Sequence, residues 1–224
     1  MDWPAIGLSL RLATATSLIL LVVGLPLAGW LALSRRQGRW VIDALVALPL
    51  VLPPTVLGFY VLVALGPRSP LGRAWESMVG HPIVFSFEGL LAASVIYSLP
   101  FAVQPFAAAF AAVDRTLIET AWCLGASRLR TFLRIIIPLA RPGIVAGVVL
   151  SFAHTIGEFG VVLMVGGNIP GSTRTLSMSI YDDVQTLDFA RAGRTSALLL
   201  AFAFVVLALT YRTQRRAGRI WPAA

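Results

Sequence analysis

The sequence contains no lysine, so all eighteen of its basic residues are arginines. A nucleotide-binding P-loop needs a lysine that reaches the β- and γ-phosphates, and this chain cannot supply one. Its only cysteine, Cys123, excludes an internal disulfide and is expected to be a packing residue. Charged residues of both signs make up only 12% of the chain. These absences exclude a P-loop ATPase and a disulfide-stabilised secreted domain.

Apolar residues dominate the composition. They make up 58% of the 224 residues, and the mean hydropathy is +0.84, far above the values usual for a soluble domain. The chain is therefore expected to be an integral membrane protein in contact with lipid. Its length leaves little for a soluble domain, so we predict a single membrane domain over residues 1–224. We expect no cofactor, no metal and no nucleic-acid partner.

Five apolar segments are each long enough to cross a bilayer as a helix, which takes about 20 residues. Their approximate ranges are 8–33, 40–65, 87–112, 142–165 and 196–211. The alternating pattern of a membrane β-barrel is absent, so the predicted fold class is all-α. The first segment is too long for the apolar core of a signal peptide and is followed by RRQGR, so we interpret it as a retained span.

The distribution of arginines predicts the orientation. With the N-terminus outside and the C-terminus inside, twelve of the eighteen arginines face the cytoplasm. These are Arg35, Arg36, Arg39, Arg115, Arg128, Arg130, Arg134, Arg141, Arg212, Arg215, Arg216 and Arg219. Short cytoplasmic loops of membrane proteins carry such an excess of positive charge, so this orientation is favoured. The polar segment between the third and fourth spans is then cytoplasmic.

That polar segment, at about 113–138, is predicted to be a helical hairpin. Apolar residues recur at helical spacing before Gly125, which can end a helix, and a second short helix can run from Ser127 through Arg134. Its arginines and apolar residues permit two interpretations. One is an amphipathic anchor on lipid headgroups. The other is a docking element for a cytoplasmic partner, and Pro138 would then begin the next span with a kink.

The spacing of Glu119, Ala121, Gly125, Ile135, Ile137 and Pro138 resembles the EAA loop of permease subunits in ATP-binding-cassette (ABC) importers. Thr120 and Ile137 depart mildly from the family pattern. The resemblance implies a type I importer permease fold and a hairpin that fits a cleft on a separate cytoplasmic ATPase subunit. The implied coupling residues are Glu119, Ala121, Gly125, Arg128 and Pro138. A symmetric homodimer, which would supply ten spans, is implied as well.

Candidate pathway residues lie in the second and fourth spans. Glu158 is an ionisable residue in an apolar stretch, which marks either a functional site or a structurally paired one. We favour a structural role, because a fixed carboxylate is an unfavourable neighbour for an anion. His154 lies one helical turn away and could hydrogen-bond with it, but the two residues lack the further ligands that a metal site needs. Gly160 permits close helix approach.

Hydroxyl and proline residues complete the candidate pathway. Thr55, Ser151 and Thr155 offer hydroxyl donors inside the membrane, and the adjacent Pro53 and Pro54 free backbone carbonyls and can open a bend. No arginine lies deep in a span, so a strong internal anion trap is not expected. A path of this kind would bind its ion weakly enough to release it.

The run HTIGEFGVVLMVGGNIPG, the following SIYDDVQ and LPLVLPPTVLGFYVL resemble molybdate importer permeases, and the likeness extends over nearly the whole chain. It implies transport of a tetrahedral oxyanion, molybdate or tungstate, delivered by an external binding protein to the outer segment 166–194. A sulfate permease is the first alternative, because composition and spacing do not separate these cargoes. An ATP-independent secondary transporter is the second, although such carriers usually show inverted repeats and several intramembrane acids.

Overall fold

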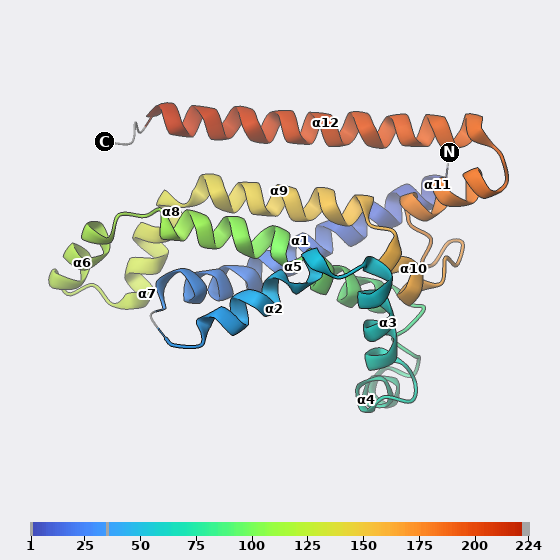
Figure 1. Ribbon diagram of the computed structural model, residues 1–224, viewed down its shortest axis with the longest axis horizontal. Helices are drawn as coiled ribbons and strands as arrows, with labels where there is room; N and C mark the ends of the chain where they lie inside the picture. The colour runs from blue at the N-terminus through green and yellow to red at the C-terminus, as the bar shows by residue number, and fades with distance from the viewer. Residues whose placement is uncertain (1, 35, 221–224) are drawn as a thin grey trace.

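The computed structural model describes residues 2–34 and 36–220, and helices joined by turns and short loops account for these residues without any β-strand. The long helices lie side by side, with the N-terminus at one end of the molecule and the C-terminus at the other (Figure 1). The predicted all-α fold is therefore confirmed. Arg35, one of the arginines expected to face the cytoplasm, lies outside the described residues.

Three helices are each long and apolar enough to cross a membrane alone. They are α1 (Trp3–Leu33), α5 (Phe87–Ala111) and the part of α12 (Phe189–Ile220) that ends at Ala208. The carboxylate of Asp2 starts α1 by accepting a hydrogen bond of 3.0 Å from the backbone N–H of Ala5. Pro26 in α1, and Pro100 and Pro105 in α5, leave both helices continuous, as membrane helices commonly allow.

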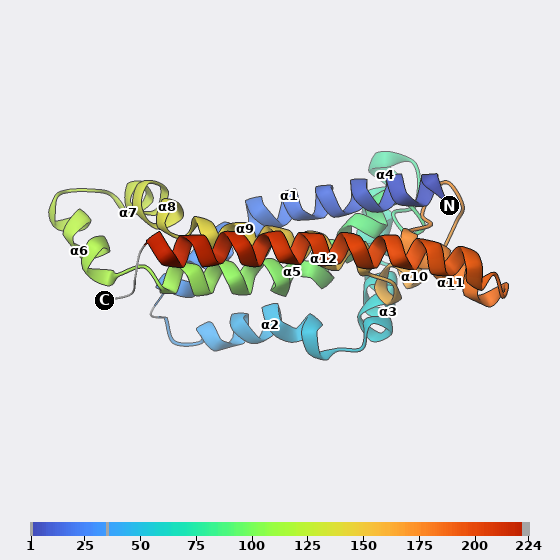
Figure 2. The ribbon, with the colours of Figure 1, turned by 90° about the horizontal axis from the view of Figure 1, so that it is seen from above.

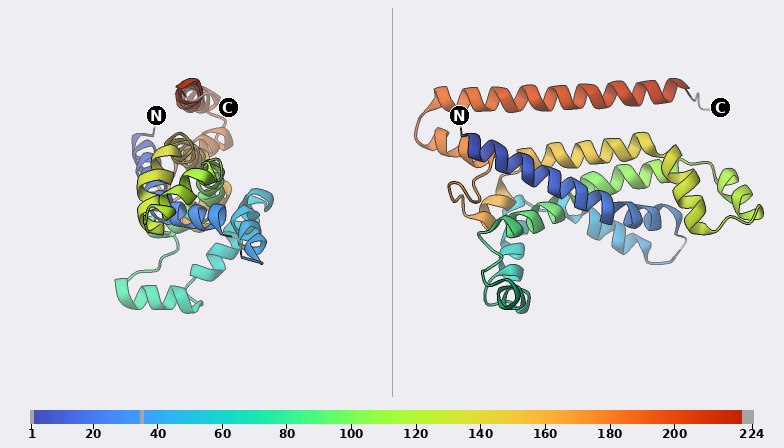
Figure 3. Two further views of the ribbon diagram at one scale, coloured as in Figure 1. Left: turned by 90° about the vertical axis from the view of Figure 1, so that its left-hand side faces the viewer. Right: turned by 180° about the vertical axis from the view of Figure 1, so that it is seen from behind.

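The second predicted span is not one straight helix. It consists of α2 (Arg39–Val51) and α3 (Pro54–Leu65), whose axes differ in direction by 114°. Pro53 and Pro54 stand at the bend, where neither nitrogen can donate a backbone hydrogen bond. The bend expected from these two prolines is present, but it is sharp enough to turn α3 across the direction of the long helices (Figure 3).

The fourth predicted span, 142–165, is also interrupted. It divides into α9 (Arg141–Gly157) and α10 (Gly160–Gly166), because Glu158 has an extended backbone with ψ 137° and Phe159 is non-helical too. The expectation of a continuous helix was therefore wrong at these two residues. A second bend of 75° separates α9 from the helical segment Arg128–Leu139 that precedes it. Counting each bent pair as one span, up to five spans cross the membrane.

The remaining helices are short. They are α4 (Pro70–Val79), α6 (Arg115–Cys123), α7 (Arg128–Thr131), the π-helix Phe132–Ile136, α8 (Ile137–Leu139) and α11 (Leu176–Gln185). Figure 2 shows α6, α7 and α8 at one end of the molecule, and α4, α10 and α11 toward the opposite end, where the chain begins. The hairpin and the N-terminus thus lie on opposite sides, as the predicted topology requires.

The core is a three-helix packing of α1, α5 and α9. Phe106 of α5 is fully buried at its centre, and Leu20 and Val103 are buried in the same cluster. Small residues let the helices approach, since a methyl group added to Gly147 of α9 would stand 2.5 Å from Cε1 of Phe106. By contrast, α12 runs along one side of this bundle, and Leu200 and Phe204 are about 70% exposed, which suits lipid contact (Figure 1).

We predict that Gly147→Ala destabilises the bundle, because the new methyl group collides with the ring of Phe106 and with the carbonyl oxygen of Ala102 at 2.9 Å. Overpacking of this kind costs about 1–3 kcal/mol. Thermal unfolding of the purified chain in detergent measures the effect. Gly193→Ala in α12 is the matched control, since its methyl group meets no atom within 4 Å. Equal melting of both variants would contradict the packing described for α5 and α9.

Candidate functional site

The first arm of the hairpin predicted at about 113–138 is α6. Asp114 caps it by accepting a hydrogen bond of 2.8 Å from the N–H of Thr116. The helix ends at a turn in which Gly125 has a φ of +82°, in the left-handed region that favours glycine, and the N–H of Ala126 donates back to the carbonyl of Ala121 at 2.9 Å. The helix, glycine turn and second helix predicted from the sequence are therefore present.

The second arm begins at Ser127, whose hydroxyl caps α7, and continues through a π-helical turn into α8. In this turn the N–H of Ile137 donates to the carbonyl of Phe132, five residues earlier. The next residue, Pro138, has no N–H to donate, so the backbone accommodates it by a local change of helical pitch. Pro138 thus stands where the hairpin turns toward α9.

Phe132 anchors this arm to the spanning helices. Its ring packs edge-on against Phe110 of α5, with 5.3 Å between centroids. On the other side it fills the space left by Gly29 of α1, where an added methyl group would stand 2.8 Å from Cε2 of the ring. Phe132 is partly buried and packs against the core cluster of the spanning helices. The exposed large apolar residues of the hairpin are Leu117, Trp122, Leu124, Leu129 and Leu133.

The predicted coupling residues divide by exposure. Ala121 is buried, whereas Glu119, Gly125 and Arg128 are exposed. Glu119 and Arg128 also line one pocket, formed between the hairpin and the end of α1. The two polar residues that the motif singled out thus come together from different helices of the hairpin.

A second cavity, of about 600 Å³, lies among the spanning helices where the two helix breaks meet. Pro54 and Thr55, at the start of α3, line it together with Glu158 and Gly160, at the break between α9 and α10. The contact is close, because a methyl group on Gly160 would stand 2.7 Å from Cβ of Pro54. The structure therefore brings together four of the seven residues predicted for the pathway. Pro53 stands at the bend itself and does not line the cavity.

Glu158 is the acidic residue of this cavity and is only 4% exposed. Within the part of the chain that the structure describes, neither carboxylate oxygen has a hydrogen bond of normal geometry or an ion-pair partner. Its polar neighbour on α5 is the hydroxyl of Ser94. His154 does not bond to it, because its ring stacks on Phe101 with centroids 3.8 Å apart and its Nδ1 lies 2.9 Å from Oγ of Ser98.

Ser151 and Thr155 are also on α9, but they do not line the cavity. Both are buried, and the hydroxyl of Thr155 lies 2.9 Å from Oγ of Ser98 on α5, while it also donates to the carbonyl of Ser151. The Thr155 hydroxyl therefore connects α9 to α5, whereas the Ser151 hydroxyl donates to the carbonyl of Val148 within α9. Sequence reasoning did not single out Tyr97, which lines the cavity, or Ser98, because isolated polar residues are common in membrane helices.

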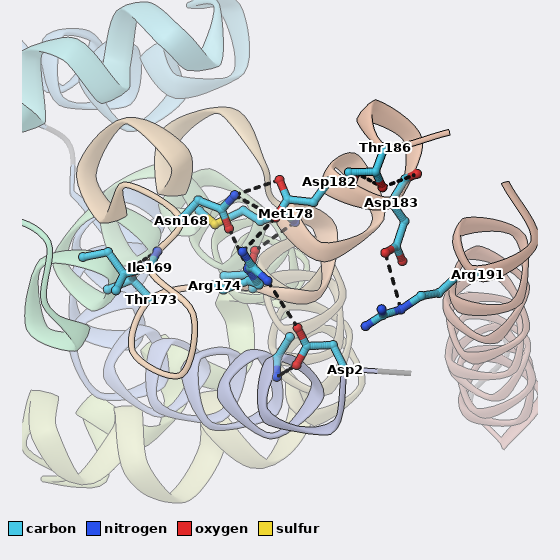
Figure 4. A network of polar contacts seen from close by, with 12 residues as sticks. Asp2, Asn168, Ile169, Thr173, Arg174, Met178, Asp182, Asp183, Thr186 and Arg191 are labelled. Atoms are coloured by element: carbon cyan, nitrogen blue, oxygen red, sulfur yellow. Dashed lines mark hydrogen bonds and ion pairs between the residues drawn. The ribbon is translucent and has the colours of Figure 1, made fainter. Parts of the chain in front are cut away.

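On the outer side, an ion-pair network holds the loop between α10 and α11 (Figure 4). The Arg174 side chain donates to Oδ1 of Asn168 at 3.1 Å and pairs with Asp182 of α11 at 3.1 Å and with Asp2 at 3.9 Å. The amide of Asn168 donates to both carboxylate oxygens of Asp182, at 2.9 and 3.0 Å. The backbone N–H of Leu176 also donates to the Ser9 hydroxyl of α1 at 2.8 Å. The outer loop is thus fixed to the start of α1.

The fold and these sites define a multi-pass membrane permease subunit. Residues 22–216 match the family described as "Binding-protein-dependent transport system inner membrane component". The chain belongs to this family, whose members are inner-membrane components of importers.

Curated relatives cover almost the same length. The chain is 49% identical to the molybdenum transport system permease protein ModB of Azotobacter vinelandii, over 96% of this chain and 95% of that protein. It is 36% identical to ModB of Escherichia coli (strain K12), over 97% of both chains. A probable sulfate transport system permease protein, cysT of Prototheca wickerhamii, is 32% identical over 94% of this chain and 82% of that protein.

Solved structures confirm the fold. A chain of a bacterial ABC transporter for alginate import superposes with a TM-score of 0.76 at 19% identity, over 95% of this chain and 78% of that one. A chain of the MetNI methionine ABC transporter gives a TM-score of 0.71 at 17% identity, over 95% of this chain and 94% of that one. The chain therefore has the type I ABC importer permease fold predicted from its hairpin.

We predict that Gly160→Ala destabilises the folded protein. The new methyl group would collide with the rigid ring of Pro54 and push α10 away from α3. The expected loss is about 1–3 kcal/mol of stability. Thermal unfolding of the purified chain measures it. Gly157→Ala is the matched control. Gly157 lines the same cavity, but a methyl group added to it meets no atom within 4 Å. A loss of the same size in the control would show that glycine flexibility, and not close approach, matters here.

Proposed function

We propose that the chain is the membrane-spanning subunit of an ABC importer that carries molybdate into the cytoplasm. The identity of 49% over 96% of the chain to a molybdenum transport permease carries this proposal. The chain has no lysine for a P-loop, so a separate ATPase subunit supplies the energy. We expect the purified chain alone to have no ATPase activity.

The hairpin is proposed to dock on that ATPase. Glu119, Gly125 and Arg128 are exposed at the end of the molecule that carries the arginine excess, where a cytoplasmic partner can reach them. The π-helical turn before Pro138, and the ring of Phe132 between α1 and α5, give the hairpin a stiff connection to the spans. In this mechanism, ATP binding draws the hairpins of two copies together and the connection turns the spans outward, while hydrolysis resets them.

The cavity at the two helix breaks is proposed to be part of the pathway. Irregular backbone is tolerated at membrane depth where it is buried in protein or lines a cavity, and both breaks meet this condition. Thr55 offers a hydroxyl to the passing anion. Glu158 is not a suitable contact for the passing ion, because a charged carboxylate would repel an oxyanion. We therefore assign it a structural role at the break, where its side chain is buried beside Ser94.

Assembly follows from the same features. Up to five spans are few for enclosing a path, so we propose a homodimer with two hairpins against two ATPase subunits. An external binding protein would land on the outer segment 166–194. The network around Arg174 supports this assignment, because it holds the loop against α1 and α11 in the absence of a partner.

Sulfate is the second candidate cargo, favoured by the relative described as a probable sulfate permease. Uptake of labelled molybdate into proteoliposomes that contain the permease, the ATPase and the binding protein decides between them. We expect uptake that requires ATP, that unlabelled molybdate or tungstate abolishes, and that equal sulfate leaves nearly unchanged. If unlabelled sulfate reduced the uptake more strongly than unlabelled molybdate did, the cargo would be reassigned to sulfate. Uptake without ATP or the ATPase would instead indicate a secondary transporter.

We predict that Gly125→Val weakens ATPase docking. Gly125 has a backbone conformation in the left-handed region, which costs a valine about 1–2 kcal/mol. The turn between α6 and α7 would therefore open. The amount of ATPase that co-purifies with the membrane-inserted permease measures the effect. Gly125→Asn is the matched control, because asparagine tolerates a positive φ and the site has no atom within 4 Å of an added Cβ. Full ATPase recovery and normal uptake with valine would remove the docking assignment.

A further inference from the structure

A pocket of about 570 Å³ lies between the end of α1 and the cytoplasmic hairpin, and we name it the hairpin pocket. Three arginines line it, Arg36 after α1, Arg115 at the start of α6 and Arg128 at the start of α7, together with one acid, Glu119. Its volume is in the range of small-molecule sites, about 300–1,000 Å³. The pocket therefore has room for a ligand and a formal excess of two positive charges.

The arginines of the hairpin pocket have no ion-pair partner within the described residues, and Glu119 has none either. On the outer side, by comparison, Arg174 and Arg191 each pair with an aspartate. Three unpaired guanidinium groups around one pocket favour an anion, and arginine binds phosphate oxygens especially well through its planar fork of N–H donors. The geometry thus points to a phosphate-bearing ligand.

The floor and the position of the pocket indicate the kind of phosphate. Ile118 and Ile136 are buried apolar residues that line it, and Leu33, where the apolar run of α1 ends, lies at its edge. Trp122, an amphipathic ring of the kind that gathers at membrane interfaces, lines it as well. A pocket with arginines, an apolar floor and a place at the end of a span fits a lipid headgroup with the start of its acyl chains.

We propose that the hairpin pocket binds one anionic phospholipid of the inner leaflet, whose phosphate lies among Arg36, Arg115 and Arg128. The lipid would connect the end of α1 to both arms of the hairpin. This site is separate from the cavity at the helix breaks, and the permease alone would bind the lipid, although Glu119 and Arg128 of the pocket are also proposed to dock on the ATPase. Its test therefore needs neither ATPase nor cargo. The lipid proposal can fail while the proposed transport function stands, and the transport function can fail while the lipid proposal stands.

Native mass spectrometry of the full chain, released from nanodiscs of equal phosphatidylglycerol and phosphatidylcholine, tests the proposal. We expect the chain to retain one phosphatidylglycerol, and the double variant R36Q/R115Q to bind it roughly 30-fold more weakly. The matched control is R68Q/R73Q, which removes two exposed arginines from the other side of the molecule, and it should retain the lipid. Should the double variant not fold, R36Q and R115Q singly should each lose roughly fivefold.

Three results of the lipid measurement would overturn the proposal. One is equal retention of phosphatidylglycerol and phosphatidylcholine, and another is equal loss from the pocket variant and its control. The third is displacement of the lipid by millimolar inorganic phosphate or molybdate, which would identify a site for a soluble oxyanion. ATPase co-purification is measured separately on the same variants. If R36Q/R115Q keeps the lipid but loses the ATPase, the arginines serve docking and the lipid assignment is wrong.

Discussion

A bilayer gives the backbone no hydrogen-bond partner, and this constraint decides where the helices of this chain can break. Each of the two interrupted spans breaks at a residue that faces the same internal cavity, Pro54 of α3 and Glu158 after α9. Neither break is exposed to lipid alone. The close approach of Gly160 to Pro54 packs the two breaks against each other, while Pro54 and Thr55 stay exposed on the side of the cavity. The cavity is therefore a consequence of where irregular backbone can be accommodated.

One aromatic contact connects the hairpin to the same bundle. Phe132 leaves the hairpin and inserts between Gly29 of α1 and Phe110 of α5, so a displacement of the hairpin must move both helices or break this packing. Close-packed interiors resist continuous deformation, which favours movement of the hairpin and the spans as connected bodies. Pro138 lies six residues after Phe132, at the turn toward α9. The third core helix is therefore connected directly to the second arm of the hairpin.

Sequence reasoning succeeded where a residue acts through its own backbone. Gly125 predicted the left-handed turn and Pro53 with Pro54 predicted the bend, because glycine and proline restrict local conformation directly. It failed at Glu158, where hydropathy predicted a continuous span. The break there depends on tertiary contacts that one sequence does not reveal. For the same reason His154 was matched with Glu158 one turn away, although its partner, Ser98, lies 56 positions earlier on α5.

The placement of charge along the molecule also bears on transport. Arg174 and Arg191 are paired with acids on the outer side, and no arginine lines the cavity at the helix breaks. An oxyanion that entered that cavity would meet a buried carboxyl group and hydroxyls and, among the described residues, no arginine that would hold it tightly. A path must release its ion as readily as it admits it, so weak binding at this point suits a permease whose selectivity is set by an external binding protein. The hairpin pocket at the opposite end of the molecule carries Arg36, Arg115 and Arg128, which form no ion pair within the described residues. The excess of arginine at that end favours the orientation predicted from the sequence.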